Sequence, residues 1–168
     1  MQNGKQRGFA YLSVMIMVAV MSIMAFQLSG TLSVRMNRGK EADLLFNGNQ
    51  IASAVKSYFE SGPVRGCYPP NFEALLEDRR DFQTHRHLRM AYKDPMSAPD
   101  SVDGGWGILR DHSENITGVF SKSTDRPYKQ GDFPKHQKDF EGRSQYSEWQ
   151  FLAKGSKVKP ASAAVCNQ

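Results

Sequence analysis

Histidine, cysteine and serine are the side chains in this sequence whose chemistry could support metal binding or catalysis. The candidates for a zinc site are Cys67, His85, His87, His112 and His136. His85 and His87 are two positions apart, which would place them on different sides of a helix. Zinc motifs such as Cys-x-x-Cys and His-Glu-x-x-His do not occur. Ser121 and Ser123 do not lie in a Gly-x-Ser-x-Gly nucleophile elbow. We therefore expect surface histidines, no metal site, and no enzyme.

The two cysteines, Cys67 and Cys166, have a second potential role. An even count permits one disulfide if the domain lies outside the cytoplasm, although two unpaired thiols remain the alternative. A bond between them would close a loop of about 100 residues. The chain-entropy model gives such a loop about 4–5 kcal/mol of stabilisation.

The charge distribution bears on nucleic-acid binding. The 168 residues have a formal net charge of +5, without a run of five like charges. Basic side chains gather near Tyr92, at Arg79, Arg80, Arg86, Arg89, His85 and His87. Because Glu77, Asp78 and Asp81 alternate with them, a mixed solvated face is favoured over a phosphate-binding surface. Nucleic acid is not an expected partner.

An apolar segment at residues 9–32 is the element that would position the rest of the chain. From Phe9 to Phe26 its only polar residues are Ser13 and Ser22. About 20 apolar residues in a helix cross a hydrocarbon core of roughly 30 Å. The segment is therefore predicted to be a transmembrane helix. A cleavable signal peptide, cut near residues 29–31, and a plain signal anchor are the alternatives.

The residues just before this segment suggest a more specific interpretation. A basic leader, residues 1–8 (MQNGKQRG), ends at Gly8, and Phe9 opens the apolar segment. This arrangement resembles the class III signal of type IV pilins and type II secretion pseudopilins. In that family a prepilin peptidase cuts before the apolar segment and methylates the new N-terminal Phe. The resemblance implies cleavage between Gly8 and Phe9, with the helix retained.

The fifth position after this cut differs from the family pattern. The family usually has Glu there, whereas this chain has Ser13. A carboxylate in lipid is tolerated because it meets the N-terminal amine of a neighbouring subunit. Serine fits a subunit with no neighbour above it, at a fibre tip, or a divergent subunit. The resemblance also implies that apolar side chains pack between subunits, namely Val14, Ile16, Val18, Val20, Ile23, Phe26 and Leu28.

The helical pattern continues beyond the apolar segment. Leu44, Ile51 and Val55 recur at helical spacing among polar residues, which is typical of one buried stripe. Residues 61–63 (Ser-Gly-Pro) are a stop signal. The predicted organisation has four parts: a leader (1–8), a transmembrane and assembly helix (9–34), its amphipathic continuation (35–61) and a small periplasmic α+β domain (62–168).

Short elements are predicted in the last part. Asn71 is placed to cap a helix over residues 72–80, and a second helical piece is expected within 81–92. Strands are predicted at 106–110, 116–121 and 148–153. Three short antiparallel strands need another surface to pack against, and the stripe of the long helix provides one, with Trp106 and Trp149 in the core. The expected fold is α+β and pilin-like: a long N-terminal helix packed on a small antiparallel sheet.

Two short stretches are similar to major pseudopilins in particular. Asp94-Pro95-Met96 looks like the Asp-Pro-aromatic turn before their sheet, and residues 116–121 followed by Asp125 look like the strand that enters their calcium loop. Because this resemblance makes calcium the cofactor to consider, the candidate oxygen ligands are Asp125, Asp132 and Asp139. The family's glycine-rich spacing is not reproduced, so a solvated loop without a cofactor is favoured.

The resemblance implies a structural subunit of a pseudopilus or type IV pilus-like fibre that serves protein secretion. It would cross the bacterial inner membrane once, with its C-terminal domain in the periplasm. Its partners would be other pilin or pseudopilin subunits, the prepilin peptidase and the inner-membrane assembly platform. Lys and Arg flank both ends of the apolar segment, so this orientation follows from the leader and not from the charge count. A signal-anchored periplasmic binding module and a minor pilin of a DNA-uptake pilus are the alternatives.

Overall fold

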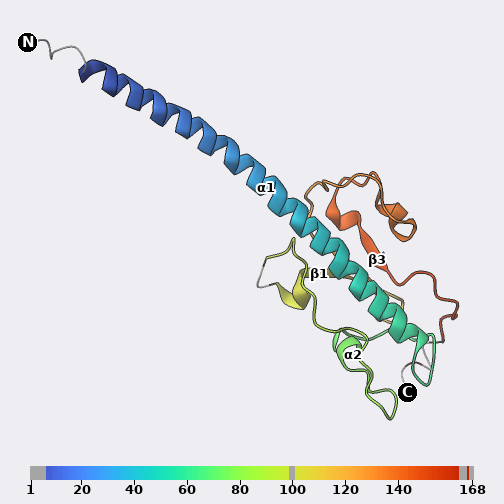
Figure 1. The fold of residues 1–168 in the computed structure, drawn as a ribbon. Coiled ribbons are helices and arrows are strands. Elements are labelled where there is room, and N and C mark those ends of the chain that lie inside the picture. The colour runs from blue at the N-terminus through green and yellow to red at the C-terminus, as the bar shows by residue number, and fades with distance from the viewer. Residues whose placement is uncertain (1–6, 99–100, 163–165, 167–168) are drawn as a thin grey trace, which may run out of the picture. The chain divides into compact units, whose positions relative to one another are not determined.

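The computed structural model describes residues 7–98, 101–162 and 166, and among these the side chains of all but 7–9, 25–32 and 102–103. Figure 1 shows the elements, which in chain order are α1 (Arg7–Glu60), α2 (Glu73–Leu76), η1 (Val102–Gly105), β1 (Trp106–Arg110), β2 (Ile116–Ser121), η2 (Lys135–Phe140), η3 (Tyr146–Glu148) and β3 (Gln150–Leu152). Helices and a small antiparallel sheet together confirm the α+β class. The chain divides into two compact units, residues 1–39 and 40–168.

Helix α1 continues into the second unit and supplies one side of its core. The side chains of Leu44, Ile51, Val55 and Tyr58 are buried there, at the spacing of a single helical stripe. The predicted stripe residues Leu44, Ile51 and Val55 are thus buried on one side of the helix. The helix ends at Glu60, directly before the predicted stop, and Gly62 adopts a φ of +81° that favours glycine.

The sheet has the strand order β1-β2-β3, and both pairings are antiparallel. The bounds of β1 and β2 agree with the predicted strands. The third strand is shorter than predicted because residues 146–148 form the 3₁₀ turn η3. Val119 on β2 pairs with Phe151 on β3. A Cβ atom on Gly48 of α1 would lie 2.6 Å from the Phe151 ring, so α1 packs directly against this strand.

Aromatic side chains fill the space between α1 and the sheet. Trp106 and Trp149 are fully buried, which confirms their predicted place in the core. Trp149 stacks on Phe140 of η2 with ring centroids 5.4 Å apart, and Phe140 also contacts Phe151 edge-on. The indole N–H of Trp106 donates to the Tyr92 carbonyl at 2.9 Å, so its polar atom is satisfied on burial.

The region after α1 departs from the predicted helices. The helix expected over residues 72–80 is only α2, although the Asn71 Oδ1 atom does accept a hydrogen bond from Ala74 N. The helical piece expected within 81–92 is wrong. Asp78 and His85 form an antiparallel bridge instead, and the Leu88 N–H donates to the Leu75 carbonyl. These long-range backbone hydrogen bonds replace those of a local helix.

Candidate functional site

The apolar segment of α1, residues 10–24, is the most unusual surface of the first unit. Its large side chains are exposed around the whole helix: Tyr11, Leu12, Val14, Met15, Ile16, Met17, Val18, Val20, Met21, Ile23 and Met24. Val14 to Val18 alone are five consecutive positions and therefore cover every direction around the axis. A helix that is apolar all round is normally buried in protein or in lipid. This surface includes the predicted packing residues Val14, Ile16, Val18, Val20 and Ile23.

The two serines in this segment satisfy their hydroxyls within the helix. Ser13 Oγ donates to the Ala10 carbonyl at 2.9 Å, and Ser22 Oγ donates to the Val18 carbonyl at 2.8 Å. Neither hydroxyl therefore needs water or another partner. Over the residues that it describes, the structure has no helix with a run both long and apolar enough to cross a membrane.

Four predicted site residues lie partly outside this description. Gly8 and Phe9 fall in the first turn of α1, which begins at Arg7, but the surroundings of Gly8 and the side chain of Phe9 are not among the parts described. The same holds for the side chains of Phe26 and Leu28. Processing at Gly8 and packing by these two apolar residues therefore remain predictions.

The candidate metal ligands are dispersed. Asp139 pairs with Lys154, Asp125 accepts a hydrogen bond from Ser123 Oγ at 3.1 Å, and Asp132 has a φ of +59°. Within the described parts of the chain, no three His, Cys, Asp or Glu side chains gather as a metal site would require. His85, His112 and His136 are exposed, whereas the His87 side chain is only 6% exposed and belongs to the network described below.

Cys67 and Cys166 are joined by a disulfide with their Cα atoms 5.5 Å apart. The sequence left pairing and two unpaired thiols open, and in the structure the cysteines pair. The bond spans 99 positions, so it ties the C-terminal end of the chain to the loop that follows α1. Disulfides of this kind persist in oxidising compartments such as the periplasm.

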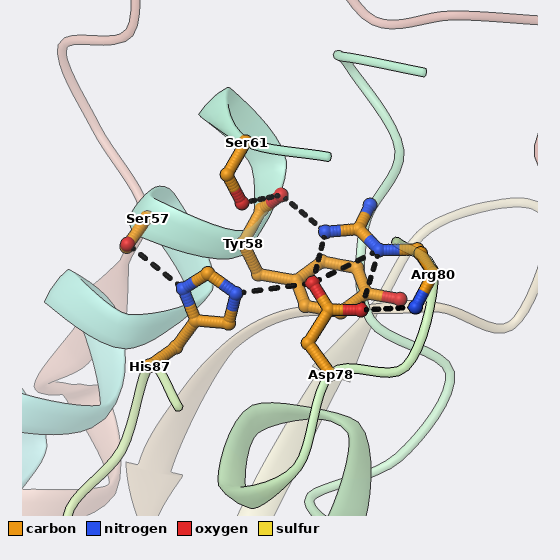
Figure 2. A network of polar contacts seen from close by, with 6 residues as sticks. All are labelled: Ser57, Tyr58, Ser61, Asp78, Arg80 and His87. Carbon is orange, nitrogen blue, oxygen red and sulfur yellow. Dashed lines mark hydrogen bonds and ion pairs between the residues drawn. The ribbon is translucent and has the colours of Figure 1, made fainter. Parts of the chain in front are cut away.

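A buried polar network, the Asp78 network, fastens the chain after α2 to the end of α1 (Figure 2). Arg80 donates to both Asp78 carboxylate oxygens, at 2.9 Å and 2.7 Å for the shortest bonds, and to the Tyr58 carbonyl at 2.9 Å. On the other side of Asp78, His87 Nε2 lies 3.1 Å from Oδ2. Figure 2 shows His87 reaching on to Ser57, whose Oγ is 2.9 Å from Nδ1.

The electrostatics of the Asp78 network favour the ionised carboxylate. Burial raises the pKa of Asp78, but the hydrogen bonds from Arg80 and His87 together outweigh it and lower the pKa to about 2. The Arg80 guanidinium also lies 3.4 Å from the centre of the Tyr58 ring, at cation–π distance. Arg80 therefore neutralises Asp78 and covers α1 at the same time.

Ser57, His87 and Asp78 follow one another as in a catalytic triad, but their setting does not support acyl transfer. Ser57 lies inside α1, where backbone N–H groups donate along the helix. An oxyanion hole needs such donors aimed at the substrate. The Asp78 network is therefore assigned a structural role.

A second carboxylate on α1, Glu41, anchors the connection between β2 and β3. Its oxygens accept hydrogen bonds from Tyr128 N at 2.7 Å, Lys129 N at 3.1 Å and Tyr146 Oη at 2.8 Å. Burial, with the hydrogen bond to Glu41 adding to it, raises the pKa of Tyr146. The sequence offered no signal for this contact, because nothing local relates Glu41 to residues almost ninety positions later.

The predicted turn at Asp94-Pro95-Met96, here called the Asp94 turn, is hydrogen-bonded to the end of β2. Asp94 Oδ1 accepts a hydrogen bond from Met96 N at 2.8 Å, and Oδ2 accepts one from Ser121 Oγ at 2.7 Å. Burial raises the pKa of Asp94, which the bond from Ser121 partly offsets. The turn therefore fixes the end of β2 and has a structural part in the domain.

Comparison of the chain with protein-family models, with curated proteins and with solved structures gave no match in any of the three. Two features are candidates for function: the exposed apolar segment of the first unit, and the surface of the second unit around the Asp78 network.

Proposed function

We propose that this protein is a structural subunit of a pseudopilus or type IV pilus-like fibre, held in the bacterial inner membrane before assembly. The observation that carries the proposal is the apolar segment of α1. Eleven large apolar side chains of residues 10–24 are exposed around one helix, in a chain whose other unit has a hydrophobic core of its own. Burying one such side chain contributes about 1.5–3 kcal/mol, so this surface needs a cover of lipid or protein.

The proposed mechanism is an exchange of lipid for neighbouring helices. In the membrane, lipid tails would surround Val14, Ile16 and Val18; in the fibre, the same side chains would contact other subunits. Because lipid tails are as apolar as these side chains, the exchange would depend on van der Waals packing and not on a hydrophobic gain. Extraction by an assembly platform would supply the work.

Ser13 supports a particular place in such a fibre. Serine is uncharged, and its hydroxyl is already bonded to the Ala10 carbonyl, so this position presents neither a charge nor an unsatisfied donor to a neighbour. A subunit at the tip has no neighbour above it and does not need a carboxylate there. We therefore propose a tip or minor position.

The second unit is consistent with a periplasmic location for the C-terminal domain. Its disulfide would be stable in an oxidising compartment, and its core is closed by α1, the sheet and η2. The domain would contact neighbouring subunits or secreted cargo.

The intact mass and N-terminal sequence of protein purified from membranes test the proposal, in cells with and without a prepilin peptidase. We expect a chain that begins at methylated Phe9 only where the peptidase is present. A chain that retains residues 1–8 in both strains would contradict it and leave a signal anchor. A chain that begins near Thr31 would mean a secreted domain without the apolar segment.

Two glycines of the leader provide matched variants. Gly8→Val is expected to block cleavage, because the resemblance places Gly8 at the cut. Gly4→Val makes the same change four positions earlier and is expected to leave cleavage intact. Equal processing of both variants would remove the resemblance as a guide to this chain.

A further inference from the structure

A short loop beside the Asp78 network, residues 79–86, presents an aromatic side chain to solvent. We call it the Phe82 loop. Phe82 has an exposed fraction of 108%, as high as in an extended peptide. Its neighbours from Asp81 to Arg86 are exposed as well. A bulky apolar side chain held this far from its own domain is well placed to be buried by a partner.

The Phe82 loop is held at its base. Asp78 and His85 exchange two backbone hydrogen bonds, of 2.8 Å and 3.0 Å, which close the loop. The Asp78 network binds this base to Ser57 and Tyr58 of α1 (Figure 2). Because the base is fixed by buried contacts, little conformational entropy would be lost at the loop when Phe82 is buried by a partner.

A pocket lies next to the loop on the same chain. Its apolar lining includes Pro70, Ala74 and Leu76, and its volume is about 820 Å³. The pocket is an open depression with both polar and apolar lining residues, and it is wide enough for a phenyl ring, since an enclosed cavity of about 150 Å³ already admits benzene. Glu73 and Glu77 lie on the same lining, beside Arg79 and Arg80.

Arginines near the loop and a carboxylate on the pocket lining have opposite charges, although Asp81 of the loop is itself acidic. Arg86 and Arg89 are exposed just after Phe82, whereas Glu73 is exposed on the pocket lining. The two cations that line the pocket each pair with a carboxylate other than Glu73: Arg79 pairs with Glu77 at 3.0 Å, and Arg80 pairs with Asp78 at 2.7 Å. Glu73 is thus the carboxylate available to an arginine from outside.

We infer that Phe82 of one copy inserts into this pocket of a second copy, with Arg89 against Glu73. The proposed contact is reciprocal: two copies exchange loops across a two-fold axis, as in an isologous dimer. A reciprocal contact closes on two copies and does not extend into a fibre. It is therefore separate from the proposed assembly through α1 and does not depend on cleavage at Gly8.

Photocrosslinking tests this inference in the full chain in membranes. Phe82 is replaced by p-benzoylphenylalanine, and two differently tagged copies are expressed together. We expect a crosslinked product that carries both tags, joined to the peptide that contains Ala74 and Leu76. The same replacement at Phe46, an exposed aromatic on α1, is the control and should not label that peptide. Absence of a product with both tags, or a crosslink to another protein, would overturn the inference.

Charge reversal adds a test of the specific contact. Glu73→Arg alone and Arg89→Glu alone each create a like-charge pair across the proposed interface and should lower the doubly tagged product about tenfold. The two changes in one chain restore opposite charges and should restore the product. Both side chains are on the surface, so thermal unfolding should not move by more than a few degrees. A double variant as poor as the single ones would contradict the contact.

Discussion

Tyr146 Oη donates a hydrogen bond of 2.8 Å to Glu41 Oε2, across 105 positions of sequence. Glu41 is nearly fully buried on α1, and it also accepts the backbone N–H groups of Tyr128 and Lys129. A single carboxylate therefore holds the long connection between β2 and β3 against the helix. Charge-assisted bonds of this kind are stronger than neutral ones, so the contact should contribute to domain stability.

Removing the Tyr146 hydroxyl should weaken the domain measurably. Tyr146→Phe keeps the ring in the core but loses one bond to a charged acceptor, and we expect about 1.5–3 kcal/mol less free energy of unfolding. Urea unfolding of the full chain in detergent, followed by Trp fluorescence, measures it. Glu41→Gln combined with Tyr146→Phe completes a double-mutant cycle. A coupling energy near zero would mean that the hydroxyl does not act through Glu41.

Acid should destabilise the domain through Asp78. Its pKa falls from an ordinary 3.8 to about 2 in the folded state, so the folded state favours the carboxylate. This stabilisation is fully present above about pH 4 and is lost as the pH falls towards 2; the shift corresponds to about 2 kcal/mol. In Asp78→Asn we expect lower stability at pH 7 and a flatter curve between pH 4 and 2, measured by urea unfolding at each pH.

Asp94 supplies a control with the opposite sign. Burial raises its pKa, so the folded state takes up a proton more readily there and gains stability as the pH falls. Asp94→Asn should therefore make the acid loss steeper. If the two variants changed the acid profile in the same direction, this account of the Asp78 network would be wrong.

The disulfide should contribute more than any one of these contacts. Its loop spans 99 positions, for which the chain-entropy model gives about 4–5 kcal/mol. Cys67→Ser combined with Cys166→Ser should lose that stabilisation, and dithiothreitol should have the same effect on the unchanged protein. Unfolding with and without reductant measures it, and the double variant must then be insensitive to reductant. Two reactive thiols in the native, unreduced protein would contradict the pairing.

A charge in the apolar segment should weaken membrane retention. Ile16→Asp places a carboxylate near the middle of the proposed span, where translocon-based scales give roughly 2.5–3.5 kcal/mol per charged residue. We expect more of this variant to be released from membranes by alkaline carbonate than of the unchanged protein. Phe82→Asp makes a similar change on the second unit and should not alter release. Equal release of both variants would argue against a membrane role for the segment.

The sequence predicted those helix and strand positions that depend on residues close together in the chain. The stripe of Leu44, Ile51 and Val55 predicted the buried side of α1, and residues 61–63 predicted where the helix ends. β1 and β2 were found because branched and aromatic residues flank a turn. The helix predicted within 81–92 failed because Asp78 pairs with His85 there, and no local rule favours that bridge over a helical turn.

The polar networks could not be predicted from the sequence, for a similar reason. Arg80 contacts Tyr58, and Glu41 contacts Tyr146, at separations of 22 and 105 positions. Such pairs are set by how α1 lies against the later chain. Sequence spacing could only mark the arginines and aspartates near residue 80 as a mixed charged face. It could not show that Asp78 is buried and Arg80 half buried, or that Phe82, between them and His87, is exposed.

Two glycines in α1 offer a final test of how the helix packs. A Cβ atom on Gly39 would have nothing within 4 Å, whereas one on Gly48 would lie 2.6 Å from the buried Phe151 ring. Gly39→Ala should add about 1 kcal/mol of helix stability. Gly48→Ala gains the same propensity but must displace the ring, and overpacking of this kind costs about 1–3 kcal/mol. We therefore expect the two changes to move the free energy of unfolding in opposite directions, measured by urea unfolding with far-ultraviolet circular dichroism. Stabilisation by both would mean that β3 does not lie against α1 at Gly48.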